Sequence, residues 1–101
     1  MSKSLGIFVS SDRHLDKIIK LCRAAKKNAV TVHIFLTHTG TLLTQEDRLK
    51  ELAELADLSL CKVTFNGHGL KPPVPGLREK DFATQARHAD LITDCDRYLV
   101  F

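Results

Sequence analysis

The stretch that decides the fold is Leu5–Leu36, which reads LGIFVSSDRHLDKIIKLCRAAKKNAVTVHIFL. It opens with a short apolar run, Leu5–Ser10, and closes with a β-branched and aromatic run, Val30–Leu36; both are typical of buried strands. Between these runs, apolar residues recur at helical spacing on one face: Leu15, Ile18, Ile19 and Cys22. A helix between two buried strands predicts a parallel strand–helix–strand unit.

The rest of the chain continues this alternation of strands and helices. A second helix is expected over Leu49–Ala56, and a third strand over Leu58–Phe65, which reads LSLCKVTF. The segment Asn66–Gly76 is dense in glycine and proline and predicts a loop. A last helix, from Asp81 to about Asp94, and a last strand, Arg97–Phe101, complete the pattern. We therefore predict a mostly parallel sheet with helices on both faces, a three-layer α/β sandwich.

The last helix is predicted from the spacing of its apolar and small residues. Apolar and small residues recur there at helical spacing: Phe82, Ala86, Ala89 and Thr93. This stripe is the expected contact with the sheet.

Length and composition favour one cytoplasmic domain over residues 1–101. The chain is 44% apolar and 27% charged, as in ordinary globular domains. No apolar run approaches the roughly 18 residues of a membrane helix, and the N-terminal run is too short for a signal peptide. The net charge of +3 allows an acidic partner but does not indicate nucleic-acid binding. We expect no membrane or nucleic-acid partner.

The three cysteines are an odd number without a CxxC pair, so we expect reduced thiols. Cys22 lies on the apolar face of a helix and is expected in the core. Cys95 lies between two aspartates, which raise a thiol pKa. Cys61 lies near the carboxyl end of the third strand beside Lys62, and two interpretations stay open. It is either a reactive thiolate or a buried strand thiol on the face opposite Leu60.

Other candidate site residues follow the strand ends, where ligands collect in parallel sheets. His38 lies on the loop after the second strand, and Gly67, His68 and Gly69 follow the third. No histidine is spaced with another histidine or cysteine as metal ligands are, so no metal is expected. There is no GxGxxG or Walker motif, and we expect no cofactor. A phosphatase-type cysteine loop places an arginine at the position of Gly67, so that chemistry is not expected.

Four segments together resemble the DsrE/DsrF/TusD family of small sulfur-relay proteins. They read GIFVSSD, VHIFLTHTG, LSLCKVTFNGHGL and PGLREKDFATQARHADLITDCDRYLVF, and they cover nearly the whole length. The resemblance implies a DsrE/flavodoxin-like fold and a helix directly after Cys61, although KVTF has no helical propensity. It also implies assembly as a trimer, a hexamer or a subunit of a mixed complex.

The resemblance implies that Cys61 accepts sulfane sulfur as a persulfide and passes it from a sulfur donor protein to an acceptor. This sulfurtransferase-like relay needs no metal or cofactor. Two roles stay open for Lys62: it either stabilises the thiolate or points to solvent, the commoner fate of a lysine. From their positions, and not from the resemblance, His38 or His68 would assist electrostatically or gate proton transfer. The alternative is a non-catalytic, oligomeric binding or scaffold module of the same fold, in which Cys61 is structural.

Overall fold

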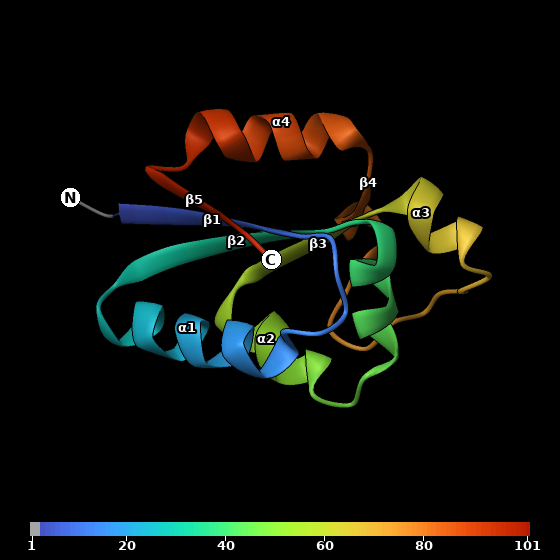
Figure 1. Ribbon diagram of the computed structural model, residues 1–101, viewed down its shortest axis with the longest axis horizontal. Coiled ribbons are helices and arrows are strands. Elements are labelled where there is room, and N and C mark those ends of the chain that lie inside the picture. Colours follow the sequence, from blue (N-terminus) through green and yellow to red (C-terminus); the bar gives the residue numbers. More distant parts are fainter. Residues whose placement is uncertain (1–2) are drawn as a thin grey trace.

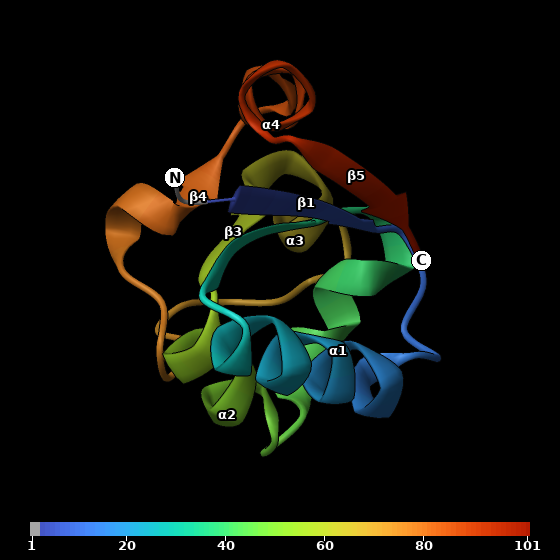
Figure 2. The same ribbon diagram turned by 90° about the vertical axis from the view of Figure 1, so that its left-hand side faces the viewer.

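A computed structural model of the chain describes residues 3–101. One sheet lies between helix α4 on one face and helices α1 and α2 on the other, so the molecule has three layers (Figures 1 and 2). The elements in chain order are β1 (Lys3–Val9), α1 (Leu15–Lys27), β2 (Val30–Leu36), η1 (His38–Gln45), α2 (Leu49–Leu55), β3 (Asp57–Cys61), α3 (Lys62–Gly67), η2 (Glu79–Asp81), β4 (Phe82–Ala83), α4 (Gln85–Asp94) and β5 (Arg97–Val100).

The sheet has five strands in the order β4-β3-β2-β1-β5, and every neighbouring pair is parallel. The predicted three-layer α/β sandwich with a mostly parallel sheet is confirmed. Strands β2, β3 and β4 are added on one side of β1, and β5 on the other. Because crossovers between parallel strands are right-handed, this reversal puts α4 on the opposite face from α1 and α2, as Figure 2 shows.

The main core fills the space between the sheet and helices α1 and α2. Ile7, Ile34 and Leu58 sit opposite one another on β1, β2 and β3 and belong to this core. A second, smaller cluster lies on the α4 face, where its buried members are Phe35, Cys61 and Leu91. Because side chains alternate along each strand, one set joins the larger core under α1 and α2, and the other set joins the smaller cluster under α4.

The third strand ends at Cys61, and Lys62–Gly67 forms α3. The prediction that the strand continues to Phe65 is wrong, and the helix implied by the resemblance is confirmed. As a strand residue, Phe65 would share the face of Cys61. The helical turn instead brings its ring into the main core, where it packs edge-on against Phe82 (centroids 5.0 Å apart). Burial of this large ring outweighs the weak helical propensity.

The last helix begins at Gln85 rather than at Asp81. Asp81 lies in η2, where its carboxylate accepts a hydrogen bond from the backbone N–H of Arg78 (2.8 Å). Thr84 then caps α4, its hydroxyl accepting from the backbone N–H of Ala86 (3.3 Å). The two-residue strand β4 lies between them and is too short to leave a periodic pattern.

The helices of the structure can be compared with those that span a membrane. Within residues 3–101, no helix combines the length and apolarity needed to cross a bilayer.

Candidate functional site

The candidate site lies at the carboxyl ends of β1, β2 and β3, where the chain continues into α1, η1 and α3. The backbone N–H of Thr37 donates to the carbonyl oxygen of Val9 (2.9 Å). The hydroxyl of Thr39 donates to the carbonyl oxygen of Ser10 (3.0 Å). These bonds tie the segment after β2 to the end of β1.

Gly40 allows this close approach. A Cβ atom at this position would lie 2.3 Å from the carbonyl oxygen of Val9, which no side chain tolerates. His38, two residues earlier, has a positive φ of 48°. The segment after β2 is therefore held in a defined, partly strained conformation beside the site.

Cys61 ends β3 and precedes the first residue of α3. Its side chain is 3% exposed and belongs to the cluster with Phe35 and Leu91, on the face covered by α4. The strand alternation therefore assigned its face correctly, opposite Leu58 and Leu60. The thiol sits in a small apolar cluster at the carboxyl edge of the sheet, closed by one helix.

The other two cysteines lie in different surroundings. Cys22 is fully buried in the main core, as predicted, and burial raises the pKa of its thiol to about 11. Cys95 is half-buried at the end of α4; burial first, and then the charges of Asp94 and Asp96, raise its pKa. A hydrogen bond with Ser4 acts in the opposite direction. The predicted rise of the Cys95 pKa is confirmed, and burial is its larger cause.

The two histidines predicted to line the site are joined. Nε2 of His68 donates to the backbone carbonyl oxygen of His38 (3.1 Å), which links the end of α3 to η1. Both histidines are exposed, and so are Gly67 and Gly69. Gly69 has a positive φ of 74°, suited to the turn that ends α3. This group forms a connection between two strand ends at the surface.

Lys62 is exposed and lines a cavity together with Asn66 and Phe82, and Cys61 is not part of that lining. Phe82 belongs to the main core, whereas Cys61 belongs to the cluster under α4. The sequence placed Lys62 beside the thiol because the two residues are adjacent. The turn from β3 into α3 gives them different surroundings.

His88 and Tyr98 are the residues of this face that the sequence did not reveal. The ring of His88 stacks on Phe8 (centroids 3.8 Å apart) and is hydrogen-bonded to the hydroxyl of Tyr98. Burial lowers the pKa of His88 and raises that of Tyr98. The aromatic neighbours therefore disfavour the charged form of His88.

The inner face of α4 differs from the predicted one. Ala86, Ala89 and Thr93 are exposed, so that stripe is wrong. The residues that meet the sheet share a different helical spacing: His88, Leu91 and Cys95. The apolar pattern of the sequence does not indicate this stripe because its first residue is a histidine.

An ion-pair cluster fastens α4 to the sheet. One carboxylate oxygen of Asp57 lies 3.0 Å from a guanidinium nitrogen of Arg87 and 3.0 Å from Nδ1 of His33. His33 has its partner in Asp57 and is partly exposed. All three residues are accessible to water, so the cluster holds α4 weakly.

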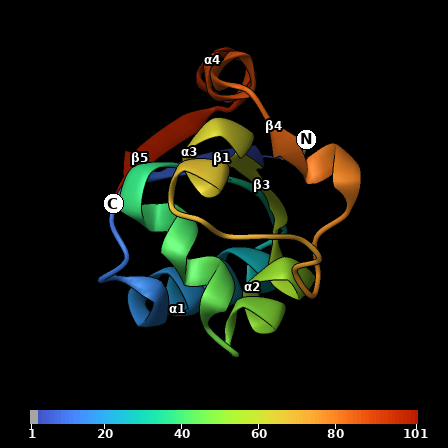
Figure 3. The same cartoon turned by 90° about the vertical axis from the view of Figure 1, so that its right-hand side faces the viewer.

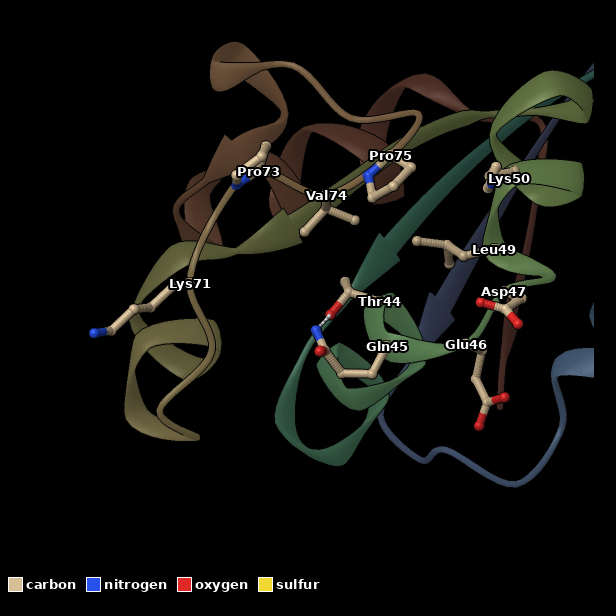
Figure 4. Close-up of a pocket in the computed structure, with 10 residues that line it drawn as sticks. All are labelled: Thr44, Gln45, Glu46, Asp47, Leu49, Lys50, Lys71, Pro73, Val74 and Pro75. Carbon is tan, nitrogen blue, oxygen red and sulfur yellow. Dashed lines mark hydrogen bonds between the residues drawn. The ribbon is translucent and has the colours of Figure 1, made fainter.

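A further hollow of about 200 Å³ lies between the end of η1 and the proline-rich loop (Figure 4). Thr44 and Gln45 are hydrogen-bonded there through their side chains (3.0 Å). Glu46 and Asp47 lie on one side of the view, while Lys71 points away from the rest. Acidic and basic groups are mixed in this lining, which favours no particular ligand charge.

The site has no metal-binding group within the part of the chain that the structure describes, residues 3–101. No known protein-family model matches the chain, and no curated protein matches it. The resemblance to sulfur-relay proteins therefore rests on the four quoted segments.

Proposed function

We propose that this protein is a sulfur carrier that holds sulfane sulfur as a persulfide on Cys61 and passes it to a partner. The observation that carries the proposal is the place of Cys61, at the junction of β3 and α3 on the carboxyl edge of the sheet. The resemblance assigns the sulfur-carrying cysteine to this position. It also implied the helix that begins at Lys62.

The transfer needs only thiol chemistry. The thiolate of Cys61 attacks the terminal sulfur of a persulfide on the donor protein. A bond forms between Sγ and that sulfur while the sulfur–sulfur bond of the donor breaks, and the donor leaves as a thiolate. The proton of the Cys61 thiol passes to solvent. An acceptor thiolate then attacks the persulfide in the same way, so no oxidant is consumed.

The surroundings of Cys61 suit a persulfide that must be kept from water. Phe35 and Leu91 pack with the thiol and leave it 3% exposed. Leu91 is the only buried side chain of those described in α4, and the helix is otherwise held by the Arg87–Asp57 ion pair, by the contacts of His88 and by Cys95 directly after it. A donor therefore reaches the thiol when α4 moves aside, which these few contacts permit.

A second candidate is an oligomeric binding or scaffold module in which Cys61 is structural. The same low exposure of Cys61 favours it. The free edge of β5 also favours self-association, because Leu99 and Val100 are exposed there. Under this alternative the partners are copies of the chain or other subunits, and no sulfur is carried.

Alkylation kinetics in the native state separate the two candidates. The carrier predicts that iodoacetamide labels Cys61 through local opening, at a rate independent of low urea concentrations, while Cys22 reacts only through global unfolding. The variant Arg87→Gln, which frees α4 from Asp57, should speed Cys61 labelling about two- to fivefold. Peptide mass spectrometry follows each cysteine separately.

The matched control is Arg48→Gln, at the residue that precedes α2. This substitution removes the ion pair with Asp16 of α1 (2.9 Å) and the longer one with Glu51 (3.4 Å), and these groups are about as exposed as Arg87 and Asp57. It should leave Cys61 labelling unchanged. The scaffold alternative predicts that Cys61 and Cys22 are labelled at the same rate and with the same urea dependence. That result would remove the reactive role of Cys61.

A further inference from the structure

A second cavity, of about 390 Å³, lies between α3 and the long loop that returns to β4. Figure 3 shows the chain leaving α3 and running back across the molecule to β4. The apolar lining comes from Val74, Leu77 and Phe82, which all belong to or pack against the main core. The volume lies within the range of about 300–1,000 Å³ common for small-ligand sites.

The rim of this cavity carries two cations and one anion. Lys62 and Asn66 lie one helical turn apart on α3, and Arg78 and Glu79 line the cavity from the start of η2. Within residues 3–101, Lys62 forms no ion pair. The apolar floor is therefore bordered by an uncommitted ammonium group.

The second cation is also largely available. The side chain of Arg78 is 71% exposed, and its Nε lies 3.9 Å from the carboxylate of Asp81, at the outer limit of an ion pair. The same Asp81 oxygen already accepts a closer hydrogen bond from the Arg78 backbone (2.8 Å). The guanidinium group thus keeps donors for a ligand.

We propose that this cavity binds a small organic monoanion, a carboxylate or sulfonate with an apolar body. The apolar body would cover Phe82 and Leu77, and the anionic group would lie between Lys62 and Arg78. Glu79 leaves the rim with one net positive charge, which suits a monoanion better than a dianion. The proposal is independent of sulfur transfer, since none of these residues belongs to the Cys61 cluster.

The test compares 2-naphthoate with the uncharged 2-naphthamide by NMR titration of the labelled protein. We expect naphthoate to cause saturable chemical-shift changes at the backbone N–H groups of Lys62, Asn66 and Phe82. We expect naphthamide to bind only weakly. Lys62→Gln and Arg78→Gln should each weaken naphthoate binding about two- to tenfold. Glu79→Gln should strengthen it.

The matched control is Lys80→Gln, which removes an exposed cation next to Glu79 but outside the cavity lining. It should leave the dissociation constant within experimental error. Equal binding of naphthoate and naphthamide, shifts centred elsewhere, or equal losses in Lys62→Gln and Lys80→Gln would each overturn the proposal. All four substitutions are at exposed positions, and the spectra report folding directly.

Discussion

Cys22 and Cys61 are both buried, but Cys22 belongs to the large main core and Cys61 to the small cluster under α4. Cys22 is enclosed between α1 and the sheet, where helical spacing placed it correctly. Cys61 lies on the α4 face in a small cluster, where its buried neighbours are Phe35 and Leu91. Strand alternation predicted the face of Cys61, but its burial depends on Leu91, which the predicted α4 stripe omitted. The burial of Cys61, unlike that of Cys22, could therefore not be predicted from the sequence.

At the residue scale, Gly40→Ala should destabilise the fold. A Cβ atom 2.3 Å from the Val9 carbonyl oxygen forces η1 away from β1, and we expect the free energy of unfolding to fall by about 1–3 kcal/mol. Urea unfolding followed by circular dichroism measures the change.

Gly67→Ala is the matched control for that substitution. An added Cβ there meets no atom within 4 Å, and the residue ends α3 without a positive φ. The free energy of unfolding should rise by up to about 1 kcal/mol. Equal effects of the two alanines would show that the contact with Val9 is not what requires a glycine at position 40.

At the scale of elements, the local sequence pattern predicts neither the start of α3 nor the sheet-facing side of α4. The sequence KVTF favours a strand by propensity, but Phe65 is buried in the main core only if the chain turns helical after Cys61. For α4, the sheet-facing stripe includes His88, which is tolerated because Phe8 stacks on it and Tyr98 bonds to it. Both outcomes depend on partners distant in sequence.

The attachment of α4 should weaken in acid. Burial lowers the pKa of His88 below its ordinary value near 6.5, so the unfolded chain binds this proton more readily than the folded one. The contribution of His88 to stability is full above that value and is lost as the pH falls below it. The free energy of unfolding should therefore decline more steeply in the wild type than in His88→Phe as the pH falls below about 6.5.

The comparison isolates His88 because the other groups on this face are shared by both proteins. Tyr98, Arg87, Asp57 and His33 are present in each. Parallel stability profiles for the wild type and His88→Phe would show that protonation of His88 does not loosen α4.

At the scale of the whole molecule, the alternation of strands and helices was enough to predict the three layers and the parallel sheet. The sequence did not reveal β4, because two residues carry no period, nor the strand order, which depends on where each crossover returns. In this order β4 and β5 form the two edges of the sheet, as Figure 2 shows. The edge at β4 is short, whereas the edge at β5 is longer and apolar.

A charged side chain placed on the exposed edge of β5 should therefore weaken self-association through that strand. Val100 is 60% exposed on this edge strand, and Val100→Lys should shift the protein toward monomers in sedimentation velocity. Val63→Lys is the control: Val63 is 76% exposed but lies on α3, and its replacement should leave the assembly unchanged. A wild-type protein that stays monomeric at high concentration would exclude this interface.

The central claim is that Cys61 carries sulfur, and mass spectrometry after incubation with a persulfide-loaded cysteine desulfurase tests it most directly. The account predicts one added sulfur atom on the Cys61 peptide, absent in Cys61→Ser, retained in Cys95→Ser, and lost when a small-molecule thiol is added as acceptor. Sulfur found on Cys95 instead, or no added sulfur on a natively folded protein, would contradict the account.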